Sequence, residues 1–183
     1  MPADAAHSLY TESKDDIQDK PVLITLFAKL DDYTENDETM TIFFSETLNF
    51  AIVDSGCSKT VCGKLWLKCY LDSLSDADSK LVEETQSQTC FKFGDGNKIR
   101  SLKKVKFPAY IADNKFYIEA DVIPNDIPLL LSKESMKRCN AKLNFHNDSI
   151  TIFDTKVPLT TTSSGHYLIS IGNTDEEFND SQI

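Results

Sequence analysis

The stretch Phe50-Ala51-Ile52-Val53-Asp54-Ser55-Gly56-Cys57 decides the fold prediction for this chain. Its first four residues are apolar and suit a buried strand. The strand ends abruptly at the carboxylate of Asp54, and Gly56 permits a tight turn close to another main chain, where a Cβ would obstruct. Ser55 offers a hydroxyl that can lock the turn, and Cys57 is small enough to pack behind it. The stretch predicts a carboxylate on a rigid element, with an ordinary acidic turn as the alternative.

Further segments rich in β-formers lie on both sides of this stretch. A short helical turn is expected between Gly63 and Leu74, and the polar, acidic segment 73–88 is expected to be a surface excursion between strands. The predicted strands are 22–28, 39–44, 48–53, 89–93, 98–107, 109–112, 115–123, 142–145, 149–153 and 167–171, with a turn at 146–148 that pairs two of them.

The clearest helix signal lies near the C-terminal end. Ser132 can serve as N-cap, Glu134 lies in the first turn, Lys137 and Arg138 lie in the last, and Asn140 suits the exit. Many short strands with one well-marked helix predict an all-β fold, built as a small closed or folded-over β-barrel.

The length of 183 residues fits one domain with short tails. Residues 1–20 are polar, acidic and aperiodic, and we expect a disordered lead-in there. The domain is expected to span 21–172, and an acidic tail follows at 173–183.

Charge and composition exclude several classes of function. The net charge of −10 argues against direct nucleic-acid binding, which needs clustered Lys and Arg. The apolar stretches are too short to span a membrane, and the acidic N-terminus does not resemble a secretory signal, so a cytoplasmic location is expected. The five cysteines form no Cys-x-x-Cys pair and the three histidines no His-Glu-x-x-His pattern, so no metal site is predicted.

Two further segments complete a family pattern with Asp54-Ser55-Gly56. One is Phe93-Gly94-Asp95-Gly96-Asn97-Lys98-Ile99, and the other is Asp126-Ile127-Pro128-Leu129-Leu130-Leu131-Ser132, which leads into the capped helix. This succession resembles the retropepsin-like aspartic proteases over about residues 22–172. The resemblance is strongest to the protease region of retrotransposon (retroelement) polyproteins, in which a strand like Gly165-His166-Tyr167 also occurs. The family usually has Gly at the position of Ser132.

The resemblance implies an acid-protease barrel with a flap hairpin and one short C-terminal helix, one lobe per chain. Asp54 would be the catalytic carboxylate, supported by Ser55 and Gly56, and a flap at Gly94, Asp95 and Gly96 would close over a polypeptide substrate. Because the motif occurs once, the second carboxylate would come from a second copy, so a homodimer is expected. The chemistry would need an activated water and no cofactor. The implied activity is an endopeptidase that cleaves its own retroelement polyprotein, in the cytoplasm or within an assembling particle.

Three alternatives remain open at this point. The chain could be a catalytically weak or inactive retroelement-derived domain kept for dimerisation or peptide binding, and Ser132 leaves room for this. The peptidase domain of ubiquitin-shuttle proteins has the same fold and dimer, although it would need accompanying ubiquitin-related domains, for which this chain has no room. For single residues, Gly94 to Gly96 could form an ordinary hairpin turn, and His166 is expected to be structural rather than catalytic.

Overall fold

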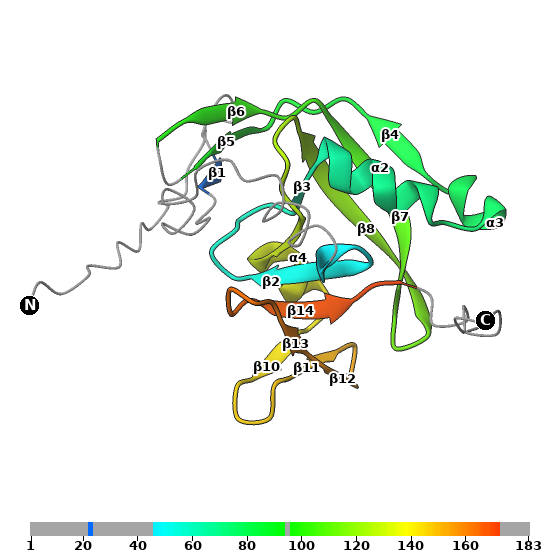
Figure 1. Cartoon of the computed structure of the whole chain (residues 1–183), viewed down its shortest axis with the longest axis vertical. Helices are drawn as coiled ribbons and strands as arrows, with labels where there is room; N and C mark the ends of the chain where they lie inside the picture. Colours follow the sequence, from blue (N-terminus) through cyan, green and yellow to red (C-terminus); the bar gives the residue numbers. More distant parts are fainter. Residues whose placement is uncertain (1–21, 24–45, 94–95, 173–183) are drawn as a thin grey trace, which may run out of the picture.

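The computed structural model describes residues 22–23, 46–93 and 96–172 of the chain. Strands dominate these residues, and a few short helices accompany them (Figure 1). The all-β prediction is therefore confirmed in part, because the described residues are mostly β with a few short helices. The predicted strand at 39–44, most of the one at 22–28, and the two residues Gly94 and Asp95 lie outside the described residues.

The main sheet has eight strands, and two of its pairings are parallel. β2 pairs in parallel with β9, and β3 in parallel with β8. The edge strands β13 and β4 pair with no further described strand, so the sheet is open and the predicted closed barrel is not seen. In spatial order the strands are β13 (Thr160–Thr161), β14 (Tyr167–Ser170), β2 (Phe50–Asp54), β9 (Leu129–Ser132), β3 (Val61–Gly63), β8 (Asn114–Ile123), β7 (Lys103–Ile111) and β4 (Glu83–Thr85).

Two small sheets of three strands flank the main sheet (Figure 1). The first contains β1 (Val22–Leu23), β5 (Cys90–Lys92) and β6 (Lys98–Arg100). The second contains β10 (Lys142–Asn144), β11 (Ser149–Ile152) and β12 (Thr155–Pro158). The antiparallel pairing of β10 with β11 confirms the hairpin predicted across residues 146–148.

The single strand predicted at 98–107 is wrong, because the chain bends between β6 and β7. The hydroxyl of Ser101 donates to the carbonyl oxygens of Lys103 and Val122, and the N–H of Leu102 also donates to Val122 O. These contacts turn the backbone out of a straight strand. The bend separates the β5–β6 hairpin from the main sheet.

The described residues contain three helices, α2 (Lys64–Asp72), α3 (Asp76–Ser79) and α4 (Lys133–Arg138). α2 lies where a short helical turn is expected and is longer than that, whereas α3 was not predicted. α2 forms because its apolar face is buried against β7. The Tyr70 ring stacks on Trp66 and tilts against Phe107, with ring centroids 5.2 Å apart in both pairs. α4 matches the predicted helix, and the side chain of Ser132 caps it by accepting from Ser135 N–H. The predicted excursion at 73–88 holds α3 and the edge strand β4.

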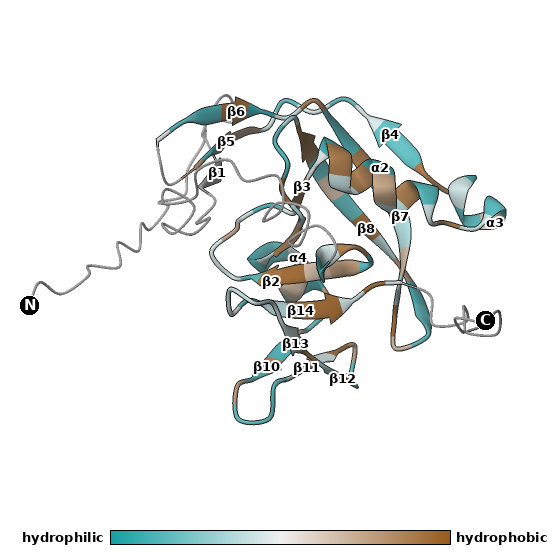
Figure 2. Ribbon diagram, viewed as in Figure 1, coloured by the Kyte–Doolittle hydropathy of each residue, from teal (hydrophilic) through white to brown (hydrophobic). Residues whose placement is uncertain are grey.

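Apolar side chains form two buried clusters. Figure 2 shows hydrophobic residues along β2, β3, β14 and α2. The smaller cluster joins Ile52 of β2, Cys57 of the following loop, Phe91 of β5 and Leu130 of β9. The β5–β6 hairpin therefore packs on the same apolar cluster as the strand that ends at Asp54. No helix within the described residues is long and apolar enough to cross a membrane.

Candidate active site around Asp54

Parallel pairing of β2 with β9 places Asp54 opposite Ser132. β9 lies between β2 and β3, so the chain leaves β2 at Asp54, loops round the end of β9 and returns on its other side. The N–H of Lys133 donates to the carbonyl oxygen of Cys57 at 2.9 Å. This bond ties the loop to the start of α4 and fixes the end of the strand that carries the carboxylate.

The carboxylate of Asp54 is held by the turn that follows it. Its Oδ1 accepts the N–H of Gly56 at 2.8 Å and the N–H of Cys57 at 3.2 Å. Asp54 is half-buried, whereas Ser55 and Gly56 are exposed beside it. The structure thus brings the three predicted residues together, with the carboxylate oriented by backbone donors. Ser55 and Gly56 keep their supporting role as a prediction.

Burial and charge act on Asp54 in opposite directions. Desolvation raises its pKa, while the N–H groups of Gly56 and Cys57 and the nearby His166 act to lower it. Burial lowers the pKa of His166, and Asp54 acts to raise it. His166 follows Gly165 in the β13–β14 turn, and its Nδ1 lies 3.0 Å from Ser164 Oγ. From the sequence, His166 is expected to be structural, because a pair of carboxylates needs no histidine as a base. Its approach to Asp54 has no local signal in the sequence.

Cys57 is buried directly behind the carboxylate. Desolvation, and then the charge of Asp54, raise the pKa of its thiol to about 12. The thiol is therefore protonated at neutral pH and donates to the carbonyl oxygen of Lys59 at 2.7 Å. This matches the small packing residue predicted from sequence, because a protonated, buried thiol is a poor nucleophile.

Ser132 stands where the resembling family has glycine, and it is 1% exposed. Its N–H donates to Thr60 Oγ1 at 3.1 Å, and its Oγ accepts the N–H of Ser135 at 3.1 Å. Thr60 Oγ1 in turn donates to Ser132 Oγ at 3.2 Å. The serine side chain is thus accommodated in a buried hydroxyl network that joins the Asp54 loop to α4.

Gly63 is a supporting residue that sequence reasoning did not single out. A Cβ added there would lie 2.3 Å from Asn125 O and 2.6 Å from Ile127 N. The N–H of Gly63 also donates to Ile127 O at 2.9 Å. Only glycine allows β3 to pass this close to the segment that leads into β9. In the sequence, a single Gly between Cys62 and Lys64 does not indicate this close approach.

The predicted hairpin after Asp54 is present as β5 and β6. At its tip the N–H of Phe93 donates to Asn97 O and the N–H of Gly96 donates to Phe93 O. Gly96 has a φ of +85°, a backbone conformation that favours glycine. Gly96 is placed at the tip, Gly94 and Asp95 lie outside the described residues, and the flap role stays a prediction. Lys59 Nζ lies 3.4 Å from Thr89 Oγ1, at the base of the hairpin.

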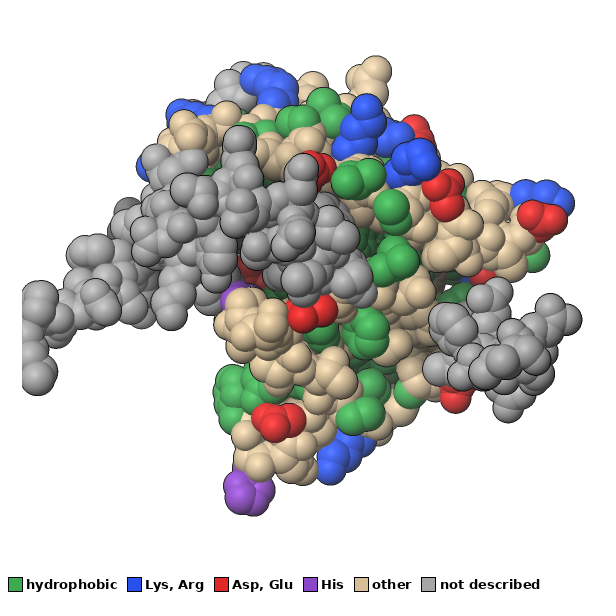
Figure 3. All heavy atoms as spheres, viewed as in Figure 1, with side chains coloured by type: hydrophobic (Ala, Val, Ile, Leu, Met, Phe, Trp, Pro, Cys, Tyr) green, Lys and Arg blue, Asp and Glu red, His purple; other side chains and the backbone are tan. Residues whose placement is uncertain are grey.

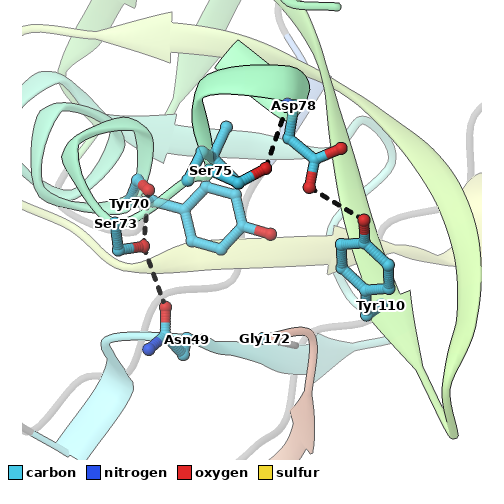
Figure 4. Close-up of a pocket in the computed structure, with 8 residues that line it drawn as sticks. Asn49, Tyr70, Ser73, Ser75, Asp78, Tyr110 and Gly172 are labelled. Carbon is cyan, nitrogen blue, oxygen red and sulfur yellow. Dashed lines mark hydrogen bonds between the residues drawn. The ribbon is translucent and has the colours of Figure 1, made fainter. Parts of the chain in front are cut away.

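A separate cavity of about 100 Å³ contains none of the predicted site residues. Figure 4 shows Asp78 of α3 pointing toward Tyr110 of β7, whose hydroxyl donates to Asp78 Oδ2 at 2.8 Å. Lys115 forms an ion pair with the same carboxylate and, as the largest cause, holds the pKa of Asp78 below its usual value. Every buried side-chain N or O atom of the described residues has a partner. This network therefore anchors α3 to the β7–β8 hairpin.

Within the described part of the chain, no group of three or more His, Cys, Asp or Glu side chains could hold a metal ion. No protein-family model matches the chain, and no curated protein matches it. One similar solved structure is the retroviral protease-like domain of Ddi1 from Leishmania major, which is 19% identical with a TM-score of 0.43. The match covers 59% of this chain and 81% of that chain.

Proposed function

We propose that this chain is an aspartic endopeptidase that works as a homodimer through Asp54 of each copy. The observation that supports this role is the environment of the carboxylate. It sits at a strand end, half-buried, with Oδ1 held by two backbone N–H groups and with its pKa raised by burial. A carboxyl group whose pKa is raised can hold or release a proton in mild acid, as general acid–base catalysis requires.

The second carboxylate comes from a second copy, because Asp-Ser-Gly occurs once in the sequence and no Asp-Thr-Gly accompanies it. Two carboxylates about 3 Å apart cannot both ionise easily, so the pair shares one proton. The ionised carboxylate takes a proton from a water molecule, whose oxygen bonds to the scissile carbonyl carbon. The protonated carboxyl polarises the carbonyl oxygen. The C–N bond then breaks, and the leaving amine takes up a proton from the pair.

The substrate of the proposed enzyme is an extended polypeptide. The β5–β6 hairpin packs on the same apolar cluster as β2, and a flap at Gly94, Asp95 and Gly96 would add main-chain hydrogen bonds to the peptide and exclude water. The polyprotein of a retroelement is the proposed natural substrate, on the sequence resemblance alone.

Cleavage of a peptide library in mild acid tests the proposal, with Asp54→Asn as the inactivating variant. We expect this variant to lose at least about a hundredfold in kcat/KM, because the general base is gone. Asp126→Asn is the matched control, since Asp126 is exposed in the loop before β9. Pepstatin should inhibit the wild type. Equal cleavage by wild type and Asp54→Asn would refute the enzymatic role. A stable dimer that cleaves nothing would favour the alternative of a dimerisation or peptide-binding module.

A further inference from the structure

The β5–β6 hairpin has one apolar face and one basic face. Phe91 of β5 pairs with Ile99 of β6, and both pack on the smaller core cluster. Lys92 pairs with Lys98, and Arg100 follows two residues later on the same face. All three cations are exposed, and basic side chains lie along the β6 margin of the molecule in Figure 3. The hairpin therefore presents three cations on its outer face.

The register places two like charges directly opposite each other, at Lys92 and Lys98. Phe93 N–H donates to Asn97 O and Ser101 N–H donates to Thr89 O, so the hydrogen-bonded pairs are 93/97, 91/99 and 89/101. Lys92 and Lys98 therefore form a non-hydrogen-bonded pair, the kind in which opposed side chains lie closest. Like charges opposed in this way destabilise a hairpin unless an anion lies between them.

The lysines of β7, in the main sheet, differ from these cations because they form ion pairs. Lys103, Lys104 and Lys106 of β7 each form an ion pair with a glutamate of β4 or β8. Lys92, Lys98 and Arg100 form an ion pair with no described residue. In a chain of net charge −10, this hairpin face is a concentrated positive surface that no carboxylate of the described residues pairs with.

The outer edge of β6 is also unpaired among the described strands. β6 is the last strand in the order β1-β5-β6, and no other described strand pairs with it. Because 98 and 100 are non-hydrogen-bonded positions relative to β5, the N–H and C=O groups of Lys98 and Arg100 point away from β5. An exposed edge with outward donors and acceptors can accept an added strand.

We propose that the free edge of β6 binds an extended acidic segment of a partner polypeptide by strand addition. Carboxylates at alternate positions of that segment lie on the basic face, opposite Lys98 and Arg100 and near Lys92. An acidic peptide fits better than nucleic acid, because a long phosphate backbone would extend past this patch toward a molecule of net charge −10. A short acidic peptide stays on the patch, and its carboxylates interact mainly with Lys92, Lys98 and Arg100, because charges farther away than the screening length of about 8 Å have little effect. This inference does not depend on catalysis by Asp54.

Fluorescence anisotropy with a labelled synthetic peptide that alternates glutamate and threonine tests the proposal. The full chain should bind it, and added salt should weaken the binding. A double variant, Lys98→Glu with Arg100→Glu, should weaken it at least tenfold and should instead bind a peptide that alternates lysine and threonine. The control variant is Lys142→Glu, the same charge change at an exposed lysine of β10 that forms no ion pair with a described residue. It should bind like wild type.

Two further peptides separate strand addition from general attraction. A peptide of the same composition with its glutamates in one block, and one with N-methyl groups on alternate amides, should both bind at least tenfold more weakly. Equal binding of either peptide overturns the proposed geometry.

Absence of binding by wild type, or an equal loss of binding in Lys142→Glu, overturns the proposed site. The lysines would then only discourage aggregation at the strand edge. Preferential binding of an oligonucleotide, lost in the double variant, would assign the surface to nucleic acid. Thermal unfolding of each variant verifies that the fold is intact.

Discussion

At the scale of the residue, two effects act on the ionised carboxylate of Asp54. The N–H groups of the turn stabilise the charge, and burial destabilises it. The carboxyl pKa is raised from 3.8, with desolvation as the largest cause. Between the unfolded and folded pKa values the native state binds more protons than the unfolded state, so the free energy of unfolding falls as pH rises through that window. The ionised carboxylate therefore costs stability at neutral pH.

We expect Asp54→Asn to have an unfolding free energy at neutral pH equal to or above that of wild type. The amide oxygen can still accept from Gly56 and Cys57, and the buried charge is gone. Urea denaturation in mild acid and at neutral pH, at one fixed protein concentration, measures this. The advantage of the variant should shrink in acid, where the wild-type carboxyl is itself neutral. A variant that is less stable than wild type at neutral pH would show that the ionised form is stabilised in the fold.

At the scale of the element, a buried hydroxyl network joins the Asp54 loop to α4. We expect Thr60→Val to lower the free energy of unfolding by about 1–3 kcal/mol, because it leaves the buried N–H of Ser132 without its acceptor. Chemical denaturation measures the change, with Thr160→Val on the exposed edge strand β13 as the control. A loss for Thr60→Val no larger than for the control would mean that the network contributes nothing to stability.

Sequence patterns predicted those elements whose signals are local. The cap at Ser132 is formed by neighbouring residues in the chain, and it starts α4. The turn at 146–148 is likewise local, and it forms the β10–β11 hairpin. The bend at Ser101 depends on Val122, and the full length of α2 depends on burial against Phe107. Contacts of this kind between distant residues leave no periodic signal.

Contacts between distant residues were also missed at the candidate site and in the main sheet. Asp54 with Gly56 was predictable from one short stretch, whereas the approach of His166 required the β13–β14 turn to fold back toward it. The edge strand β4 escaped prediction because it is polar, and its pairing with β7 includes ion pairs such as Glu83 with Lys106.

At the scale of the whole molecule, net charge and the proposed dimer oppose each other. Each chain carries −10 at neutral pH, so two copies repel, and mild acid reduces that repulsion by protonating carboxylates. We expect sedimentation over a concentration series to show a monomer–dimer equilibrium that strengthens in mild acid. Added salt at neutral pH should strengthen it too, because screening acts on the same repulsion.

Asp54→Asn should dimerise more tightly than wild type at neutral pH, since it removes the two carboxylates that meet on the proposed axis. A strict monomer under all these conditions would leave Asp54 without its partner carboxylate and would rule out the proposed dyad.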